Sequence, residues 1–132
     1  MDAARCTFEI VSWKEEAYGD AEAGPRLSRA SVTQTWAGAI EGTGAVEYLM
    51  SYAADGTAAF VGLERITGAV AGRTGSIVLR HVGSFEGGKA RSTFEVLAGR
   101  GSGDLAALGG EGTFEAGHGE PAKVEVRFRS EG

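Results

Sequence analysis

The sequence contains few of the residues from which cross-linked or metal-bound scaffolds are built. Among 132 residues there are one cysteine, Cys6, and two histidines, His81 and His118. A single cysteine cannot form an internal disulfide, and no two histidines, cysteines or acidic residues have the close spacing of a metal site. We therefore expect a fold held together by packing alone, with no metal ion and no other cofactor.

The sequence also lacks long hydrophobic runs and clusters of basic residues. No apolar segment approaches the roughly 20 residues of a transmembrane helix, and the first residues do not follow the pattern of a signal peptide. The 13 basic and 18 acidic residues give a formal charge of −5, with Lys and Arg scattered along the chain. Because nucleic-acid binding depends on clustered cations, we do not expect nucleic acid as a partner. The missing apolar run and signal-peptide pattern predict a cytoplasmic protein that does not bind a membrane.

Glycine is abundant instead. The chain has 22 glycines, many of them in pairs that separate segments of alternating apolar and polar residues. Glycine supplies the positive φ angles of tight hairpins, so this pattern predicts short strands joined by turns. The length fits a single domain over residues 1–132. The alternation predicts strands at about 5–13, 28–40, 45–54, 57–68, 75–85, 89–98, 111–116 and 122–129.

Eight strands with mostly hairpin connections predict an all-β fold, an eight-stranded antiparallel barrel, because closure leaves no exposed strand edge. A β-sandwich is the alternative architecture. The long connection from Lys14 to Leu27 is interpreted either as a lid over one mouth of the barrel or as a solvated crossover.

Tight turns fix the register of the strands that they join, so facing residues can be predicted. A two-residue turn at Asp55-Gly56 places Glu47 opposite Glu64. Three further turns extend this face to the neighbouring strands, at Gly42-Thr43, Ala71-Gly72 and Gly87-Gly88. These turns predict the pairs Trp36/Leu49, Gln34/Ser51, Gly62/His81, Glu64/Leu79 and His81/Phe94.

The face defined by this register is rich in apolar residues, and we expect it to line the barrel. Its candidate ligand-binding residues are Gln34, Trp36, Leu49, Phe60, Leu79 and Phe94. Its ionisable members are Glu47, Glu64 and His81, which we interpret as candidate catalytic residues.

Two glutamates that face each other in an apolar interior repel each other and lose their hydration. Both effects raise a carboxyl pKa, so one glutamate is expected to carry a proton while His81 takes or lends it. This combination is typical of an acid/base group in an apolar pocket. A one-residue slip at a bulge would instead turn Glu47 and Glu64 out to solvent, and a divalent-metal triad of Glu47, Glu64 and His81 is a weaker alternative.

Several stretches of the chain resemble a bacterial domain-of-unknown-function family that is grouped with the allene oxide cyclase-like barrels. The resemblance covers nearly the whole chain, and its stretches are 8–13, 27–32, 47–50, 61–68, 72–76 and 101–105. It implies an eight-stranded barrel that often forms homo-oligomers, without an established activity. Wider relatives of that barrel steer cyclisation or coupling of reactive intermediates without a cofactor, but no catalytic motif of theirs matches this chain.

The first functional hypothesis is a cofactor-independent isomerase or cyclase that acts on a small, mostly apolar metabolite. Glu47 and Glu64 would supply the acid and the base, and His81 would relay the proton. The alternative is a non-catalytic binding protein that uses the same cavity, with the glutamates orienting polar groups of the ligand. A third hypothesis is a structural module whose barrel is filled by its own side chains.

Overall fold

The computed structural model describes residues 3–130, which form nine β-strands and no helix. The strands are β1 (Ala4–Tyr18), β2 (Leu27–Gly38), β3 (Ile40–Tyr52), β4 (Ala58–Val70), β5 (Arg73–Glu86), β6 (Lys89–Val96), β7 (Ser102–Gly103), β8 (Leu108–Gly117) and β9 (Ala122–Ser130). Within this part of the chain there is no helix with the length and hydropathy to cross a membrane.

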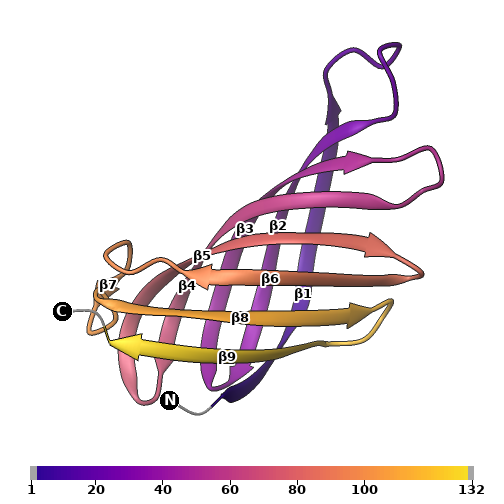
Figure 1. The fold of residues 1–132 in the computed structure, drawn as a ribbon. Helices are drawn as coiled ribbons and strands as arrows, with labels where there is room; N and C mark the ends of the chain where they lie inside the picture. The colour runs from indigo at the N-terminus through magenta and orange to yellow at the C-terminus, as the bar shows by residue number, and fades with distance from the viewer. Residues whose placement is uncertain (1–2, 131–132) are drawn as a thin grey trace.

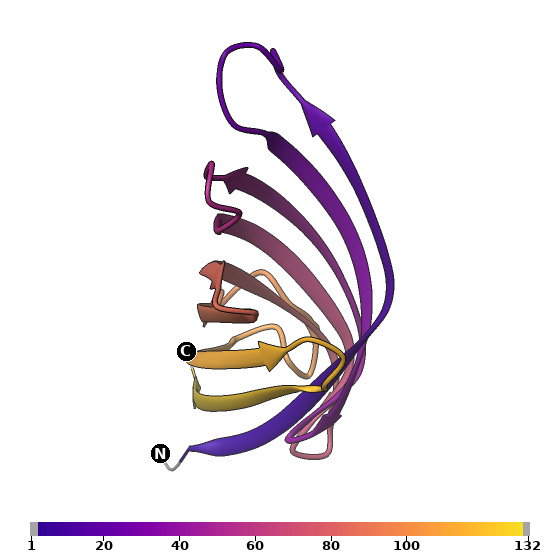
Figure 2. The same ribbon diagram turned by 90° about the vertical axis from the view of Figure 1, so that its right-hand side faces the viewer.

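The strands form one antiparallel sheet in the order β4-β3-β2-β1-β9-β8-β6-β5-β7. Because β4 also pairs with β5 along its whole length, the two sides of the sheet meet and the eight long strands close into a barrel (Figures 1 and 2). The predicted all-β, eight-stranded antiparallel barrel is confirmed.

The two ends of the barrel differ. One end, here called the hairpin end, carries the turns of the β1–β2, β3–β4, β5–β6 and β8–β9 hairpins (Figure 1). The opposite end carries the start of β1, the end of β9 and the connection 97–107 that contains β7 (Figure 1). From this connection Leu105 packs into the core, with 2% of its surface exposed.

The β1–β2 hairpin extends well beyond the other hairpins (Figures 1 and 2). The segment that we predicted as a loop from Lys14 to Leu27 is largely strand, because β1 continues to Tyr18 and its residues pair with β2 as far as Leu27. Only residues 19–26 connect the two strands.

Alternation of apolar residues dictates which side of each strand faces inward. In β2 the even-numbered residues from 28 to 36 are buried and most of their neighbours are exposed. The same parity holds in β3, β4, β6, β8 and β9, while in β5 the inward residues Ile77, Leu79 and His81 are odd-numbered. The β4–β5 and β5–β6 turns produce this change of parity, because a two-residue turn pairs an even position with an odd one.

Both two-residue turns were predicted correctly. Val70 pairs with Arg73 across Ala71-Gly72, whose φ angles are 52° and 80°. Gly87 and Gly88 have φ angles of 61° and 77° between the paired residues Glu86 and Lys89. Two successive positive φ angles characterise the type I′ turn, whose twist matches that of the strands. The predicted pairs Gly62/His81, Glu64/Leu79 and His81/Phe94 are confirmed.

The β3–β4 turn was predicted wrongly, by one residue. The Ala53 amide donates to the Thr57 carbonyl (2.8 Å) and the Gly56 amide donates to the Ala53 carbonyl (3.0 Å), so the loop has three residues. Gly56 has a φ of 89°, as in a type I turn followed by a bulge. Glu47 therefore pairs with Leu63 instead of Glu64.

The β2–β3 turn was also misplaced. The chain reverses around Ala39, next to Gly38 with its φ of 105°, and Trp36 pairs with Gly42, which itself lies within β3. The predicted pairs Trp36/Leu49 and Gln34/Ser51 are therefore wrong, and Gln34 faces Gly44. The wrong β3–β4 turn assigns the wrong side of β3 to the barrel interior. The wrong β2–β3 turn reverses the assignment again, so the inward side of β2 was still predicted correctly.

A bulge in β1 changes which residues of that strand face inward. The pairing with β2 skips Val11 between Ile10 and Ser12. Before the bulge Cys6 and Phe8 are buried, and after it the odd-numbered residues turn to the inner side.

Candidate functional site

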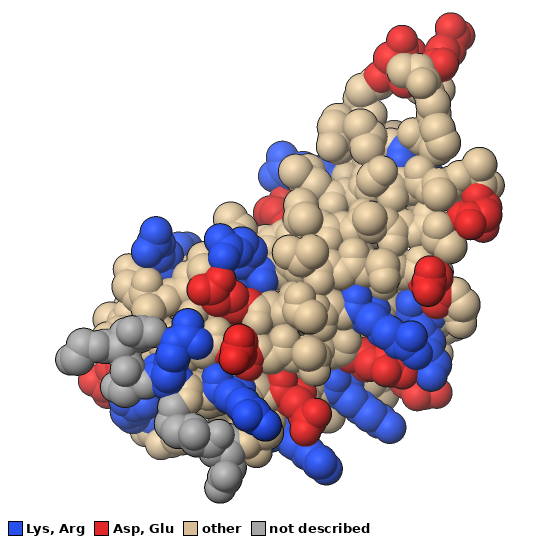
Figure 3. Space-filling model, viewed as in Figure 1, with Lys and Arg blue, Asp and Glu red and all other residues tan. Residues whose placement is uncertain are grey.

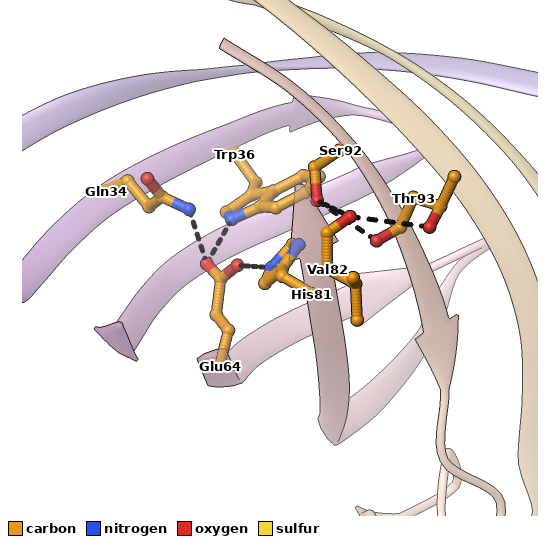
Figure 4. Close-up of polar contacts among 7 residues, drawn as sticks. All are labelled: Gln34, Trp36, Glu64, His81, Val82, Ser92 and Thr93. Atoms are coloured by element: carbon orange, nitrogen blue, oxygen red, sulfur yellow. Dashed lines mark hydrogen bonds and ion pairs between the residues drawn. The ribbon is translucent and has the colours of Figure 1, made fainter. Parts of the chain in front are cut away.

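A buried polar cluster in the middle of the barrel is centred on Glu64 of β4 (Figure 4). Its carboxylate oxygen Oε2 accepts hydrogen bonds from Gln34 Nε2 and Trp36 Nε1, both at 2.8 Å. Its other oxygen, Oε1, lies 2.8 Å from Nε2 of His81. Glu64 and His81 are 0% exposed, Gln34 1% and Trp36 2%, so the whole cluster is shielded from bulk water.

The hydrogen bonds of this cluster fix the orientation of its members. An indole N–H can only donate a hydrogen bond, and a carboxylate oxygen can only accept one. The Gln34 amide must therefore turn its NH₂ group toward Glu64. Gln34 therefore directs its amide oxygen away from Glu64, as Figure 4 shows. These partners supply the hydrogen bonds that the Glu64 carboxyl group, buried in an apolar interior, would otherwise lack.

Gly44 of β3 makes room for the Glu64 carboxylate. A Cβ atom at position 44 would lie 2.0 Å from Glu64 Oε2 and 2.9 Å from Trp36 Nε1. Contacts this short do not occur between real Cβ atoms and their neighbours, so any side chain here would displace the carboxylate. The close approach of Glu64 to the β3 backbone depends on this glycine.

His81 of β5 lies among aromatic rings. Its ring centroid is 5.5 Å from those of Phe94 and Phe114, both edge-on, and 5.8 Å from that of Tyr48. Its second nitrogen, Nδ1, is buried and has no hydrogen-bond partner among the described residues. The imidazole is therefore held by one polar contact, to Glu64, and by ring packing.

Tyr48 of β3 links the polar cluster to a cavity. Burial, together with the negative charge of Glu64, raises the pKa of Tyr48 far above its ordinary value. The phenol is consequently protonated at any physiological pH and remains a hydrogen-bond donor. Its ring packs edge-on against Phe60 at 5.1 Å and is stacked with Trp13 at 6.4 Å.

The cavity has a volume of about 260 Å³ and lies toward the hairpin end of the barrel. Aromatic and aliphatic side chains dominate its lining, Gln34 and Tyr48 contribute polar groups, and no charged residue lines it. Its lining consists of Phe8, Ile10, Trp13, Gln34, Tyr48, Met50, Tyr52, Gly56, Ala58, Phe60, Phe85, Ala90, Phe114 and Ala116. The polar cluster therefore meets the cavity through Gln34 and Tyr48.

A second carboxylate, Glu15 of β1, joins side chains at the rim of the cavity. It accepts hydrogen bonds from Trp13 Nε1 (3.0 Å), from the Tyr52 hydroxyl (2.6 Å) and from the Ser28 hydroxyl. Desolvation raises the pKa of Glu15, but the hydrogen bonds from Ser28, Tyr52 and Trp13 and the charge of Arg26 together outweigh it and lower the pKa. Two rim residues of the cavity, Trp13 and Tyr52, are thus connected through one carboxylate.

Most of the predicted site residues lie inside the barrel. The side chains of Gln34, Trp36, Phe60, Glu64, Leu79, His81 and Phe94 are all buried. Of these, Gln34 and Phe60 line the cavity, while Trp36, Glu64 and His81 form the polar cluster beside it. The catalytic and ligand-binding roles assigned to them stay predictions.

Glu47 and Leu49 are corrections to the predicted site. Both point outward, because the three-residue β3–β4 turn reverses the face of β3, and Leu49 is 50% exposed. Glu47 lies 2.7 Å from Arg29 and 2.8 Å from Ser31 on the outer surface, and hydrogen bonds from Ser31 and Arg29 lower its pKa. The predicted repulsion between Glu47 and Glu64 is therefore absent, and hydrogen-bond donors surround Glu64 in its place.

Sequence reasoning missed the other cavity residues. The predicted register points Glu47 and Leu49 inward and therefore turns their neighbours Tyr48 and Met50 outward, yet these two are 6% and 7% exposed and line the cavity. Trp13 was not among the predicted site residues, and the β1 bulge places it at the rim with 45% exposure. The run of large apolar residues at even positions of β3 was the available signal.

The triad of Glu47, Glu64 and His81 considered for a metal ion is not assembled, because Glu47 lies on the opposite face of the sheet. Across residues 3–130, no three His, Cys, Asp or Glu side chains come close enough together to hold a metal ion.

The outer face of β5, β6, β8 and β9 has alternating charges (Figure 3). Glu115 lies 3.1 Å from Lys89 and 3.5 Å from Arg91, while Arg80 contacts Glu95 on the neighbouring strand. A broad depression of about 990 Å³ on this side is lined by such pairs. Since the positive and negative side chains are interspersed, this surface has no continuous field of one sign.

Comparison with known proteins gives a family match and a solved structure. The family described as "Protein of unknown function (DUF3224)" matches residues 4–128. The chain also resembles the crystal structure of a protein of unknown function from Shewanella oneidensis MR-1, which is a DUF3224 family member. The two share 29% sequence identity, and their structures align with a TM-score of 0.85. The alignment covers 100% of this chain and 98% of that one. No curated protein matches the chain.

Proposed function

Because this chain belongs to the DUF3224 family, whose description assigns no activity, we propose its function from the barrel itself: it binds a small, mostly apolar molecule in its cavity. The binding is non-catalytic. Glu64 and His81 serve to hold Gln34 and Tyr48 in place beside the ligand.

The observation that carries this proposal is the uncharged, largely apolar cavity inside the barrel. Its volume of about 260 Å³ is slightly below that of drug-sized ligand pockets, which begin at roughly 300 Å³. An apolar cavity of about 150 Å³ is already large enough to hold benzene. A one- or two-ring compound therefore fits in the space between Tyr48, Phe60 and Phe114.

Binding is favoured over catalysis because the acid/base pair does not line the cavity. Both oxygens of Glu64 are occupied by partners within the protein, and both Glu64 and His81 are 0% exposed. A general base must come within hydrogen-bond reach of the proton that it removes. In this arrangement a ligand meets Gln34 and Tyr48 first.

A cofactor-independent isomerase or cyclase is the second candidate. One observation favours it: Gln34 lines the cavity and donates a hydrogen bond to Glu64, so a candidate acid/base group lies one side chain away from a bound ligand. For catalysis the Gln34 side chain would have to move aside, so that Glu64 comes within hydrogen-bond reach of the ligand. In that case Glu64→Gln abolishes turnover and leaves ligand affinity within a few-fold of wild type.

The grouping with allene oxide cyclase-like barrels also belongs to the proposal. The closed eight-stranded architecture supports it, although fold alone is a weak guide to function. The assembly into homo-oligomers and the cytoplasmic location likewise remain proposals, supported by the resemblance and by the amino-acid composition.

Two adjacent alanines of β4 provide a matched test of cavity binding. Ala58 lines the cavity with 5% exposure, whereas Ala59 is exposed on the outer surface. Ala58→Leu fills part of the cavity, while Ala59→Leu adds the same atoms outside. If Ala58→Leu fails to fold, Ala116→Leu, at a half-buried cavity position, takes its place.

The probe is 2-methylnaphthalene, titrated into each variant and followed by amide chemical shifts in NMR spectra. We expect the wild-type protein and Ala59→Leu to bind with similar dissociation constants. The cavity-filled variant should bind at least roughly ten-fold more weakly, because displaced apolar contacts are worth well over 1 kcal/mol. Absence of binding in the wild type, or equal binding in all variants, would refute the proposal.

A further inference from the structure

Two polar atoms at the cavity have no partner within the protein. No described residue forms a hydrogen bond with the Tyr48 hydroxyl or with the amide oxygen of Gln34, although each residue as a whole is more than nine-tenths buried. Among the described residues His81 Nδ1 is the fully buried side-chain atom that lacks a partner, so the Tyr48 and Gln34 oxygens border open space. Since both residues line the cavity, its contents are the remaining source of partners.

The chemistry of the two atoms is complementary. The raised pKa of Tyr48 keeps its hydroxyl protonated, so it offers a donor. The Gln34 amide nitrogen is already committed to Glu64, so the amide offers only its oxygen, an acceptor. A ligand hydroxyl can accept a hydrogen bond from Tyr48 and donate one to Gln34.

The lining also argues against a charged ligand. No charged side chain lines the cavity, and both oxygens of the Glu64 carboxylate are already bonded to Gln34, Trp36 and His81. An ion of either sign in this cavity would lose its hydration without gaining a free counter-ion, which is strongly unfavourable. Aromatic side chains, including Phe60 and Phe114, contribute much of the lining and fit the faces and edges of a flat ring.

From these observations we infer that the ligand is an uncharged aromatic compound with a hydroxyl group at its inner end, bound between Tyr48 and Gln34. This inference rests on the proposed function, since it names the chemical class of the molecule in the same cavity. The ring occupies the apolar part of the cavity, and the hydroxyl group completes the hydrogen bonding of the buried cluster.

Three naphthalene probes that differ in one substituent test this chemistry: 2-naphthol, 2-methylnaphthalene and 2-naphthoate. The variant is Tyr48→Phe, which removes one oxygen that bonds to nothing in the protein and keeps the packed ring. Tyr52→Phe is the control, because Tyr52 also lines the cavity but its hydroxyl donates to Glu15 at the rim. Dissociation constants come from NMR titration at pH 7, where 2-naphthol is neutral.

The expected result is a change in selectivity. The preference for 2-naphthol over 2-methylnaphthalene should fall about ten-fold in Tyr48→Phe, the effect of losing one hydrogen bond, and stay unchanged in Tyr52→Phe. In the wild type, 2-naphthoate should bind at least roughly a hundred-fold more weakly than 2-naphthol.

Other outcomes overturn different parts of the reasoning. If 2-methylnaphthalene binds but the preference for 2-naphthol does not depend on Tyr48, the hydroxyl inference is wrong and the proposed function stands. Binding of 2-naphthoate as tight as that of 2-naphthol overturns the exclusion of charge. If none of the three probes binds to the wild-type protein, the proposed function itself is wrong.

Should Tyr48→Phe fail to fold, the wild-type protein alone carries the test. The probe is then 2-methoxynaphthalene, which can accept a hydrogen bond but cannot donate one to Gln34. We expect it to bind several-fold more weakly than 2-naphthol. Equal or tighter binding of the ether would overturn the inferred contact with Gln34.

Discussion

Replacing Gly44 by alanine tests whether the buried cluster depends on the close approach of Glu64 to β3. The new Cβ atom would lie 2.0 Å from Glu64 Oε2, so the carboxylate must move away from Gln34 and Trp36. Hydrogen bonds to a charged group contribute about 1.5–3 kcal/mol each. We therefore expect Gly44→Ala to lower the free energy of unfolding by about 3 kcal/mol, although the contribution of the unfolded state has the opposite sign.

The clash and the unfolded-state effect change the free energy of unfolding in opposite directions, so the sign of the measured change shows whether the clash exists. Gly44 has no positive φ, so alanine is compatible with its backbone, and without the clash the substitution would stabilise the protein by about 0.4–1 kcal/mol through the unfolded chain. Gly117→Ala is the matched control, because it also lies in a strand and a Cβ atom there meets nothing closer than 3.7 Å. We expect the control to be neutral or slightly stabilising.

Urea unfolding of four proteins completes the test: wild type, Gly44→Ala, Glu64→Ala and the double variant. Glu64→Ala should itself cost about 3–5 kcal/mol, because it leaves buried donors without an acceptor. Once the carboxylate is gone, the added methyl group should cost little. The two substitutions should therefore be non-additive by at least about 2 kcal/mol. Gly44→Ala as stable as wild type, or equal costs in both backgrounds, would refute the reasoning.

Two further predictions concern the register and the rim. Met50→Ala should lower the free energy of unfolding by roughly 2–3 kcal/mol and Leu49→Ala by less than about 1 kcal/mol, because only Met50 is buried; equal costs in urea unfolding would show that the corrected face of β3 is wrong. Glu15, with its lowered pKa, should contribute stability above its ordinary pKa of 4.5 and lose that contribution as the pH falls through the lower, folded-state value. Glu15→Gln should therefore be less stable than wild type at pH 7 and approach it below pH 4.5, and a difference independent of pH would contradict the proposed cause.

The barrel was predictable because alternating apolar and polar residues mark each strand and glycines mark the turns between them. Ala71-Gly72 and Gly87-Gly88 favour tight type I′ turns between their strands, and the register of β4, β5 and β6 follows from them. The proximity of Glu64 and His81 on the inner face of β4 and β5 could therefore be predicted from the amino-acid sequence.

The register of β3 could not be predicted, because Asp55-Gly56 is compatible with two loop lengths. A two-residue turn and a three-residue loop both use a glycine with positive φ, and local sequence does not separate them. The burial of Tyr48 and Met50 beside exposed Leu49 distinguishes the two, but it depends on contacts with distant strands. Gln34 and Trp36 kept their inward positions only because a second misplaced turn cancelled the first.

The hairpin end and the opposite end of the barrel have consequences for handling the protein. The cavity lies toward the hairpin end, whereas β1 starts and β9 finishes at the other (Figure 1). An affinity tag, a fluorescent fusion partner or a surface tether attached before β1 or after β9 is therefore remote from the cavity. Immobilised in this way, the barrel would present its hairpin end to a passing solution of candidate compounds.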